Sequence, residues 1–218
     1  MNIRYIILLI TTLITANLYA KETLDYYSGF KISKTKLKYD NMNFENPRID
    51  DLKSGNDAQY QTSWSVLVGK ELSNYPIRVE IEYGKINSET FTSVWNPFPN
   101  YQKITSKADF LMVNALYDYK TKFVTLFAGA GIGVARIKSS AEQEISGDFN
   151  SQTNNNFTYS LIAGISKHIS EKIDIELSYR YMDLGKADTG ISKFGFQDEQ
   201  FKGDLKLNQV SLGLRFKF

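Results

Sequence analysis

A glycine-rich segment, Gly129–Ala135 (GAGIGVA), has the composition of a loop that cradles the phosphates of a dinucleotide. That chemistry needs a strand before the loop and a helix that begins at it, because the helix N-terminus helps to hold the phosphates. Here Gly129, Gly131 and Gly133 share one face of a strand-like segment, and polar sequence follows. We therefore expect these glycines to make room in a narrow interior, and we expect no cofactor.

His168 is the only histidine of the chain. A histidine base needs a nucleophile and an orienting carboxylate beside it, and a lipid-modifying enzyme is the reaction class that such a group could serve here. His168 lies in a short polar segment, KHISEK, for which we expect a turn. One histidine cannot form a histidine metal cluster, and the absence of cysteine excludes disulfides and thiolate metal sites. We expect no metal and no catalytic residue.

Eight charged residues fall at alternate positions of three segments, so each strand would carry them on one face and apolar side chains on the other. Where a strand crosses a membrane, Arg or Lys on the lipid face costs about 2–4 kcal/mol, which directs such charges to a lumen. There they either fill the lumen as a network or line a conduction path, and we expect Glu176 and Arg215 to pair. The set is Arg78, Glu80, Glu82, Asp174, Glu176, Arg180, Arg215 and Lys217.

The elements that position these residues are eight segments with a two-residue alternation of apolar and polar side chains. The last one, VSLGLRFKF, keeps this alternation up to Phe218. Helical periodicity is missing from these windows, so the sequence predicts eight strands. They are residues 26–36, 59–70, 76–84, 110–119, 123–136, 156–166, 173–181 and 210–218.

The first twenty residues differ from the rest of the chain. A positive start with Arg4, an apolar run and the end Leu18-Tyr19-Ala20 are typical of a secretory signal peptide that is removed after Ala20; an uncleaved membrane anchor is the alternative. Removing Arg4 leaves 25 basic residues against 24 acidic ones, which argues against a nucleic-acid partner. Residues 21–218 contain no apolar run long enough for a spanning helix. An exported β-protein or an outer-membrane barrel remains.

The connections and the aromatic residues favour the barrel. Connections at 70–76, 118–121 and 167–172 are short, whereas those at 37–58, 87–106, 138–155 and 187–204 are long and polar. Short periplasmic turns and long extracellular loops are the pattern of bacterial outer-membrane barrels, and aromatic residues would form a girdle at each membrane surface. The sequence therefore predicts an all-β fold, an eight-stranded antiparallel transmembrane β-barrel of residues 21–218, with both ends in the periplasm.

These segments resemble the small eight-stranded outer-membrane barrels of the OmpA-like and opacity-like porin family. The resemblance rests on LMVNALYDY, LFAGAGIGVA, IELSYRYMDLGKA and the terminal LGLRFKF, and it covers nearly all of residues 21–218. It implies that a terminal strand with Leu214, Phe216 and Phe218 is a signal for the barrel-assembly machinery. It also implies outer-membrane lipid and lipopolysaccharide as partners, and the bacterial outer membrane as the location.

The second long connection, FTSVWNPFPNY, carries an apolar cluster of Phe91, Trp95, Phe98 and Tyr101. Such a cluster either forms a contact surface for a host or surface ligand, or folds over the barrel mouth. We expect a non-enzymatic surface protein that is structural, and adhesive or antigenic through its loops. The alternative is a small pore for ions or small solutes, and the packing of the lumen distinguishes the two.

Overall fold

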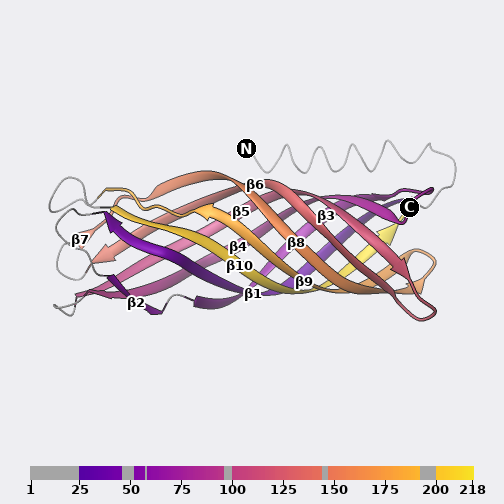
Figure 1. Cartoon of the computed structure of the whole chain (residues 1–218), viewed down its shortest axis with the longest axis horizontal. Coiled ribbons are helices and arrows are strands. Elements are labelled where there is room, and N and C mark those ends of the chain that lie inside the picture. Colours follow the sequence, from indigo (N-terminus) through magenta and orange to yellow (C-terminus); the bar gives the residue numbers. More distant parts are fainter. Residues whose placement is uncertain (1–24, 46–51, 57, 96–99, 144–146, 192–199) are drawn as a thin grey trace.

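The computed structural model describes residues 25–45, 52–56, 58–95, 100–143, 147–191 and 200–218. The predicted signal peptide lies outside this range and stays a prediction. Eight long strands and two short ones, β2 and β7, make up the fold (Figure 1). They are β1 (Tyr26–Glu45), β2 (Leu52–Asn56), β3 (Ala58–Glu71), β4 (Ile77–Trp95), β5 (Asn100–Lys120), β6 (Thr125–Gln143), β7 (Gly147–Asp148), β8 (Gln152–Ser170), β9 (Ile173–Lys186) and β10 (Gln200–Lys217).

The eight long strands close into one antiparallel barrel. Each pairs with its neighbours in the order β4-β3-β1-β10-β9-β8-β6-β5, and pairing of β4 with β5 completes the circle. The last strand lies beside the first, with Tyr27 opposite Lys217. Even Phe218 donates its backbone N–H to the Tyr26 carbonyl at 2.8 Å. The strand is regular to its end because this pairing removes the unpaired edge, which lipid does not tolerate.

The two ends of the barrel differ. Three short connections, after β3, β5 and β8, lie at the end that also holds the C-terminus (Figure 1). We call this the turn end and the opposite end the loop end. Toward the loop end β1 and β9 carry irregular register, near Asn41 and Gly185, the two described residues with positive φ (52° and 80°).

The strands are longer than the sequence predicted, which corrects the expectation of four long polar loops. β1 continues to Glu45, β6 to Gln143, and β10 begins at Gln200. These extensions still alternate between apolar and polar side chains, but here the apolar side chains point inward and the polar ones point outward. In β10 the inward positions change from Arg215 and Ser211 to Leu207 and Phe201, while the outward ones change from leucines to lysines and aspartate. A strand that leaves lipid for water needs apolar side chains inside and polar ones outside, as in any soluble barrel.

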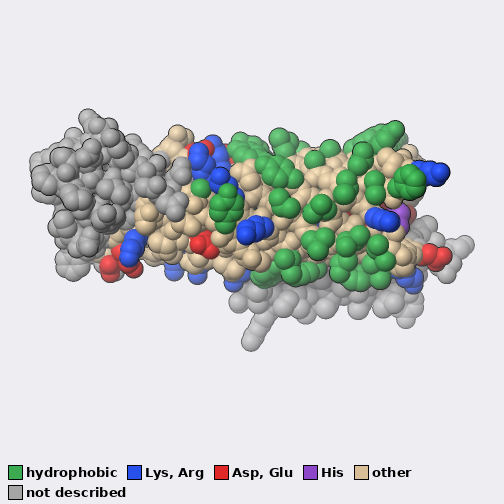
Figure 2. Space-filling model, turned by 90° about the horizontal axis from the view of Figure 1, so that it is seen from below, with side chains coloured by type: hydrophobic (Ala, Val, Ile, Leu, Met, Phe, Trp, Pro, Cys, Tyr) green, Lys and Arg blue, Asp and Glu red, His purple; other side chains and the backbone are tan. Residues whose placement is uncertain are grey.

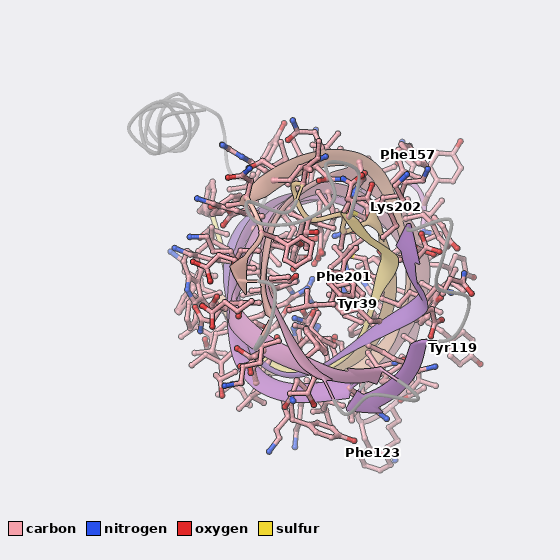
Figure 3. All side chains as sticks on the ribbon, turned by 90° about the vertical axis from the view of Figure 1, so that its left-hand side faces the viewer. Tyr39, Tyr119, Phe123, Phe157, Phe201 and Lys202 are labelled. Atoms are coloured by element: carbon pink, nitrogen blue, oxygen red, sulfur yellow. The ribbon has the colours of Figure 1, made fainter. Side chains whose placement is uncertain are left out.

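The buried apolar core accordingly lies at the loop end. It fills the barrel where the reversed alternation turns apolar residues inward; we call this part the outer barrel. Its inward side chains include Leu37, Tyr39, Ile86, Phe91, Ile104, Phe110, Met112, Ile137, Met182, Leu184, Phe201, Leu205 and Leu207. Figure 3, which looks from the loop end, shows Tyr39 and Phe201 inside the ring of strands and Phe157 outside it.

Candidate functional site: a filled lumen and an outer barrel

The turn half of the lumen is filled by charged side chains. Seven of the eight predicted lumen charges are buried there, and Lys217, the eighth, lies closer to the turn end with 11% of its side chain exposed. The interior parity of these residues follows from the apolar residues between them, which face the lipid side. Charges withdrawn from water in this way must find partners of opposite sign.

Arg180 and Glu82 form a two-pronged pair across the lumen. The Arg180 Nη1 donates to Glu82 Oε1 at 2.9 Å, and Nη2 donates to the other oxygen. Asn114 donates its side-chain N–H to Glu82 at 3.0 Å. The guanidinium also lies over the Phe110 ring, 5.8 Å from its centroid. Because β4 and β9 are not neighbours in the sheet, this pair crosses the interior rather than following the wall.

A second cluster surrounds Arg78, whose side chain is fully buried. Its Nη1 lies 2.9 Å from Glu176, and its Nε lies 3.5 Å from Glu80 and 3.7 Å from Asp118. The guanidinium stacks over Phe127, at 4.4 Å from the ring centroid. The three carboxylates around one arginine belong to a continuous network, because Glu80 and Glu176 also lie close to a second cation.

Arg215 connects this network to the turn end. Its Nε lies 3.0 Å from Glu176, the partner expected from the sequence, and its Nη2 lies 2.9 Å from Asp174. In the register Arg215 stands directly opposite Asp174, and Glu176 is its diagonal neighbour. Lys217 adds an ion pair with Glu71 at 2.9 Å. The lumen charges thus form linked ion pairs from Glu82 down to the last residues of β10.

The sequence analysis missed several members of this network. Lys31 lies within 4.0 Å of Glu80, Glu82 and Glu176. Tyr27 donates its hydroxyl to Glu80 at 2.9 Å. The sequence indicates an inward position for both, because Tyr27, Lys31 and Ser33 of β1 alternate with the lipid-facing Phe30 and Ile32. A search for every polar residue at inward parity, rather than for carboxylates and arginines, would have found them.

Along β1, β3 and β10, a layer of hydroxyl and amide groups lies between the charges and the apolar core. Ser33 and Ser211 share a hydrogen bond at 2.7 Å, and Thr35 and Ser63 share one at 2.6 Å. Gln209 donates to both Thr35 and Ser63, at 3.2 and 2.9 Å. Small polar groups satisfy one another here without the desolvation cost of charge.

The outer barrel closes the lumen above this layer. The Tyr39 ring packs edge-on against Phe91, with ring centroids 4.8 Å apart, and its hydroxyl shares a hydrogen bond of 2.6 Å with Ser106. Burial raises the pKa of Tyr39, so its hydroxyl stays protonated in neutral solution. Charges, hydroxyls and apolar rings therefore occupy successive layers of one interior.

Glycines make room for these side chains. A methyl group built on Gly84 would lie 2.1 Å from the Phe110 ring, and one on Gly69 would lie 2.4 Å from Tyr27. In the GAGIGVA segment a methyl on Gly131 would meet the Asn114 side chain at 2.1 Å. The segment is the middle of β6 and leads into more strand, so the helix that a dinucleotide loop requires is replaced by β-structure.

His168 lies at the turn end with over half of its side chain exposed, and its Nδ1 contacts the Asp174 carboxylate. Among the side-chain hydrogen bonds of the described residues, none joins His168 to a serine or threonine hydroxyl. Within the same residues, no group of three or more histidines, cysteines and carboxylates is arranged to hold a metal ion. His168 therefore lies at the turn end of the charge network and contacts it through Asp174.

The proposed contact surface of the second long connection needs a correction. Phe91 is fully buried in the outer barrel, where it packs on Tyr39, and therefore cannot form an exposed surface. Its inward parity in β4 is the reason. Trp95 and Tyr101 belong to β4 and β5, but their side chains, like all of Phe98, lie outside the described residues. The contact role of those three stays a prediction.

The outward face carries an apolar band. Figure 2 shows apolar side chains gathered over one part of the barrel, with lysine and arginine side chains at the border toward the loop end. Tyr119 and Phe123 lie on the outside at the turn end, and Trp64, Tyr83 and Tyr159 at the other border of the band. Leu214, Phe216 and Phe218 all face outward, and each is about two-fifths exposed. Aromatic rings at both borders match the two interfaces of a bilayer.

The comparisons with known proteins agree with this geometry. A model of the outer membrane protein beta-barrel domain matches residues 6–218. The chain belongs to this family. Solved structures show the same fold at low identity: Pseudomonas aeruginosa OprG (TM-score 0.58, 12% identity, covering 88% of this chain and 96% of OprG) and Neisserial surface protein A (TM-score 0.52, 16% identity, covering 88% and 97%).

Among curated proteins, the chain is 30% identical over 116 residues to a Rickettsia bellii protein named as a candidate adhesin. The match covers 49% of this chain, and the chain spans about half (51%) of the length of that relative. As a member of the outer membrane protein beta-barrel domain family, the protein is a surface barrel of the bacterial outer membrane and sits among its lipids. No helix of the described residues is long and apolar enough to span a membrane.

Proposed function

We propose that this protein is a non-enzymatic surface barrel that holds a rigid outer wall and its connecting loops away from the membrane for adhesion. The observation that carries the proposal is the reversed alternation of the long strands. Gln200 to Val210 of β10 rises about 34 Å along the strand, or about 25 Å along the membrane normal at a tilt near 40°. With the short turns in the periplasm, the outer barrel projects on the cell surface.

The relative from Rickettsia bellii, named as a candidate adhesin, supports the adhesive part of this proposal. The architecture suits it as well, because a packed apolar core makes the described wall of the outer barrel rigid, and contact residues on a rigid wall lose little entropy on binding. Residues 21–218 form the barrel after removal of residues 1–20 in this proposal. The terminal apolar residues Leu214, Phe216 and Phe218 serve as its assembly signal.

The layered lumen argues against the alternative of a small pore. The charge network, the hydroxyl layer and the outer core lie one above the other, and an eight-stranded barrel is only wide enough to be filled by side chains. We expect the refolded barrel to be electrically silent in a planar bilayer. Heat-modifiable migration on a gel provides the control for folding. Openings of a constant size from folded protein would contradict the proposal and favour the pore.

Surface display in a non-adherent bacterial host tests adhesion. We expect display of the wild type to raise the binding of the host to cultured animal cells over that of an empty host. The variant Trp95→Ser/Phe98→Ser/Tyr101→Ser measures the share of the predicted contact residues, and Phe123→Ser, at the turn end, is its control. Equal binding by wild type and empty host, with the barrel folded and displayed, would overturn the adhesive function.

A further inference from the structure

Four lysines gather on the outward face of the seam between the first and last strands. Lys34, Lys36 and Lys38 alternate along β1, and Lys206 of β10 stands opposite Lys38. They lie outside the lumen, because the residues between those of β1 are inward and fully buried, as Leu37 is. We call these four residues the seam lysines.

The seam lysines begin where the apolar band ends. Lys34 pairs with Val210, the uppermost apolar residue of the outward face of β10. From Val210 to Phe218 the strand rises about 27 Å, which is about 20 Å along the membrane normal, against an apolar band about 25 Å tall in such barrels. Lys34 therefore lies at the border of the outer leaflet, and Lys36 and Lys38 follow at steps of about 5 Å in the headgroup region.

The upper part of the seam contains carboxylates, Asp40 and Asp204, whereas its lower part contains only lysines. Lys38 and Lys206 share one carboxylate, Asp40, at 2.7 and 2.9 Å. Lys36 lies over the Tyr60 ring, 5.6 Å from its centroid. Within the part of the chain that the structure describes, no carboxylate lies at ion-pair distance from Lys34 or Lys36.

Another pair of outward basic residues has different cross-strand neighbours. Lys85 and Arg136, also outward, both stand opposite Asp109 in the register. Lys85 and Arg136 thus have a carboxylate as a cross-strand neighbour. The cross-strand neighbours of Lys34 and Lys36 are uncharged: Val210, Thr62, Asn208 and Tyr60.

We propose that the seam lysines bind the phosphate groups of the glycolipid in the outer leaflet. An ammonium group binds phosphate as a point charge. Near an anionic membrane surface, each lysine adds to the electrostatic attraction for the lipid headgroups. Successive lysines of β1 are spaced by two residues, about 7 Å, which suits a headgroup with more than one phosphate. Tyr60 and Trp64, on the neighbouring strand, place aromatic rings beside the same row.

The test is binding of bis-phosphorylated lipid A to the full barrel, refolded in detergent and measured as lipid adducts by native mass spectrometry. We expect saturable binding by the wild type and at least about tenfold weaker binding by Lys34→Gln/Lys36→Gln. Lys120→Gln/Lys122→Gln, at the turn end, removes the same charge far from the seam and is expected to leave affinity unchanged. Heat-modifiable migration confirms that each variant is folded.

Two further ligands identify what is recognised. Dephosphorylated lipid A is expected to bind the wild type as weakly as the seam variant binds lipid A. Inorganic phosphate is expected not to compete at equal concentration. Four results would each overturn the proposal. They are unchanged affinity of the seam variant, an equal loss in the turn-end variant, full binding of the dephosphorylated lipid, and competition by free phosphate.

Discussion

Arg78 and Glu176 lie 2.9 Å apart across the lumen, although their strands β4 and β9 are not neighbours in the sheet. The pair therefore connects opposite walls of the barrel. Both side chains are buried, and the attraction between their charges offsets the free-energy cost of withdrawing each charge from water. Such a contact joins residues that are far apart in the chain, and it forms only when the barrel is closed.

Removal of Arg78 tests this relationship. Arg78→Met removes a cation that Glu176 and Glu80 share, although Lys31 stays near both carboxylates and Arg215 stays 3.0 Å from Glu176. We therefore expect a loss in the free energy of unfolding at the lower end of the range of about 3–5 kcal/mol for a broken buried pair. Arg78→Met/Glu176→Gln should lose less than the sum of the single variants, with a coupling of about 0.5–3 kcal/mol. Urea unfolding of the barrel in lipid vesicles measures all three, and Lys122→Gln, in an exposed turn, is the control. Strict additivity would show that the pair contributes nothing.

Phe91 tests the outer barrel as a packed unit. Phe91→Ala removes the ring that packs on Tyr39, and we expect a cost of about 3–5 kcal/mol, confined to the loop end. Limited proteolysis should then cut the outer barrel, while heat-modifiable migration of the membrane part persists. Thr90→Ala changes the exposed neighbour on the same strand and should have little effect. Equal protease resistance of both variants would contradict a packed outer core.

Gly185 has a φ of 80°, and a methyl group there would lie 2.9 Å from the Asn156 side chain. Asn156 donates to the carbonyls of Leu184 and Lys186 on either side, at 3.0 and 2.7 Å. We expect Gly185→Ala to destabilise the barrel by about 1–2 kcal/mol, since only glycine adopts this backbone freely. Gly213→Ala is the comparison, because its new methyl would first meet the flexible Lys31 side chain at 3.0 Å. A smaller loss at Gly185 than at Gly213 would argue against backbone strain.

Asp40 gives the outer seam a pH dependence. Hydrogen bonds from Lys206 and Lys38 hold the pKa of Asp40 below its ordinary value. A lowered pKa in the folded state means that the carboxylate stabilises the fold above about pH 4 and that this contribution disappears as the pH falls through the folded pKa. Because these pairs are partly exposed, we expect Asp40→Asn to cost only about 0.5 kcal/mol.

Unfolding of wild type and Asp40→Asn at pH 7 and near pH 2 checks this expectation. The two proteins should differ at pH 7 and converge at the lower value. Asp204→Asn removes a neighbouring carboxylate of the same seam and serves as the comparison. A difference that grows as the pH falls would contradict the sign.

The sequence by itself determined the membrane part of the barrel. Alternation in residues 76–84 and 210–218 assigns each side chain to lipid or lumen, because lipid excludes charge from one face and leaves polar residues only the other. For the same reason the sequence was enough to expect Glu176 and Arg215 together: both have inward parity on adjacent strands, near the same end.

The tertiary structure decided two features that the alternation alone does not predict: the extent of the strands and the contacts across the lumen. The extensions of β1, β6 and β10 are polar on average and resemble loops, yet they are strands with the opposite assignment of faces, because their surroundings change from lipid to water. Contacts across the lumen, such as Arg78 with Glu176 and Tyr39 with Phe91, depend on barrel closure and shear, which set the residues that meet at one height. Local periodicity carries no information on that distance, so only the closed barrel fixes it.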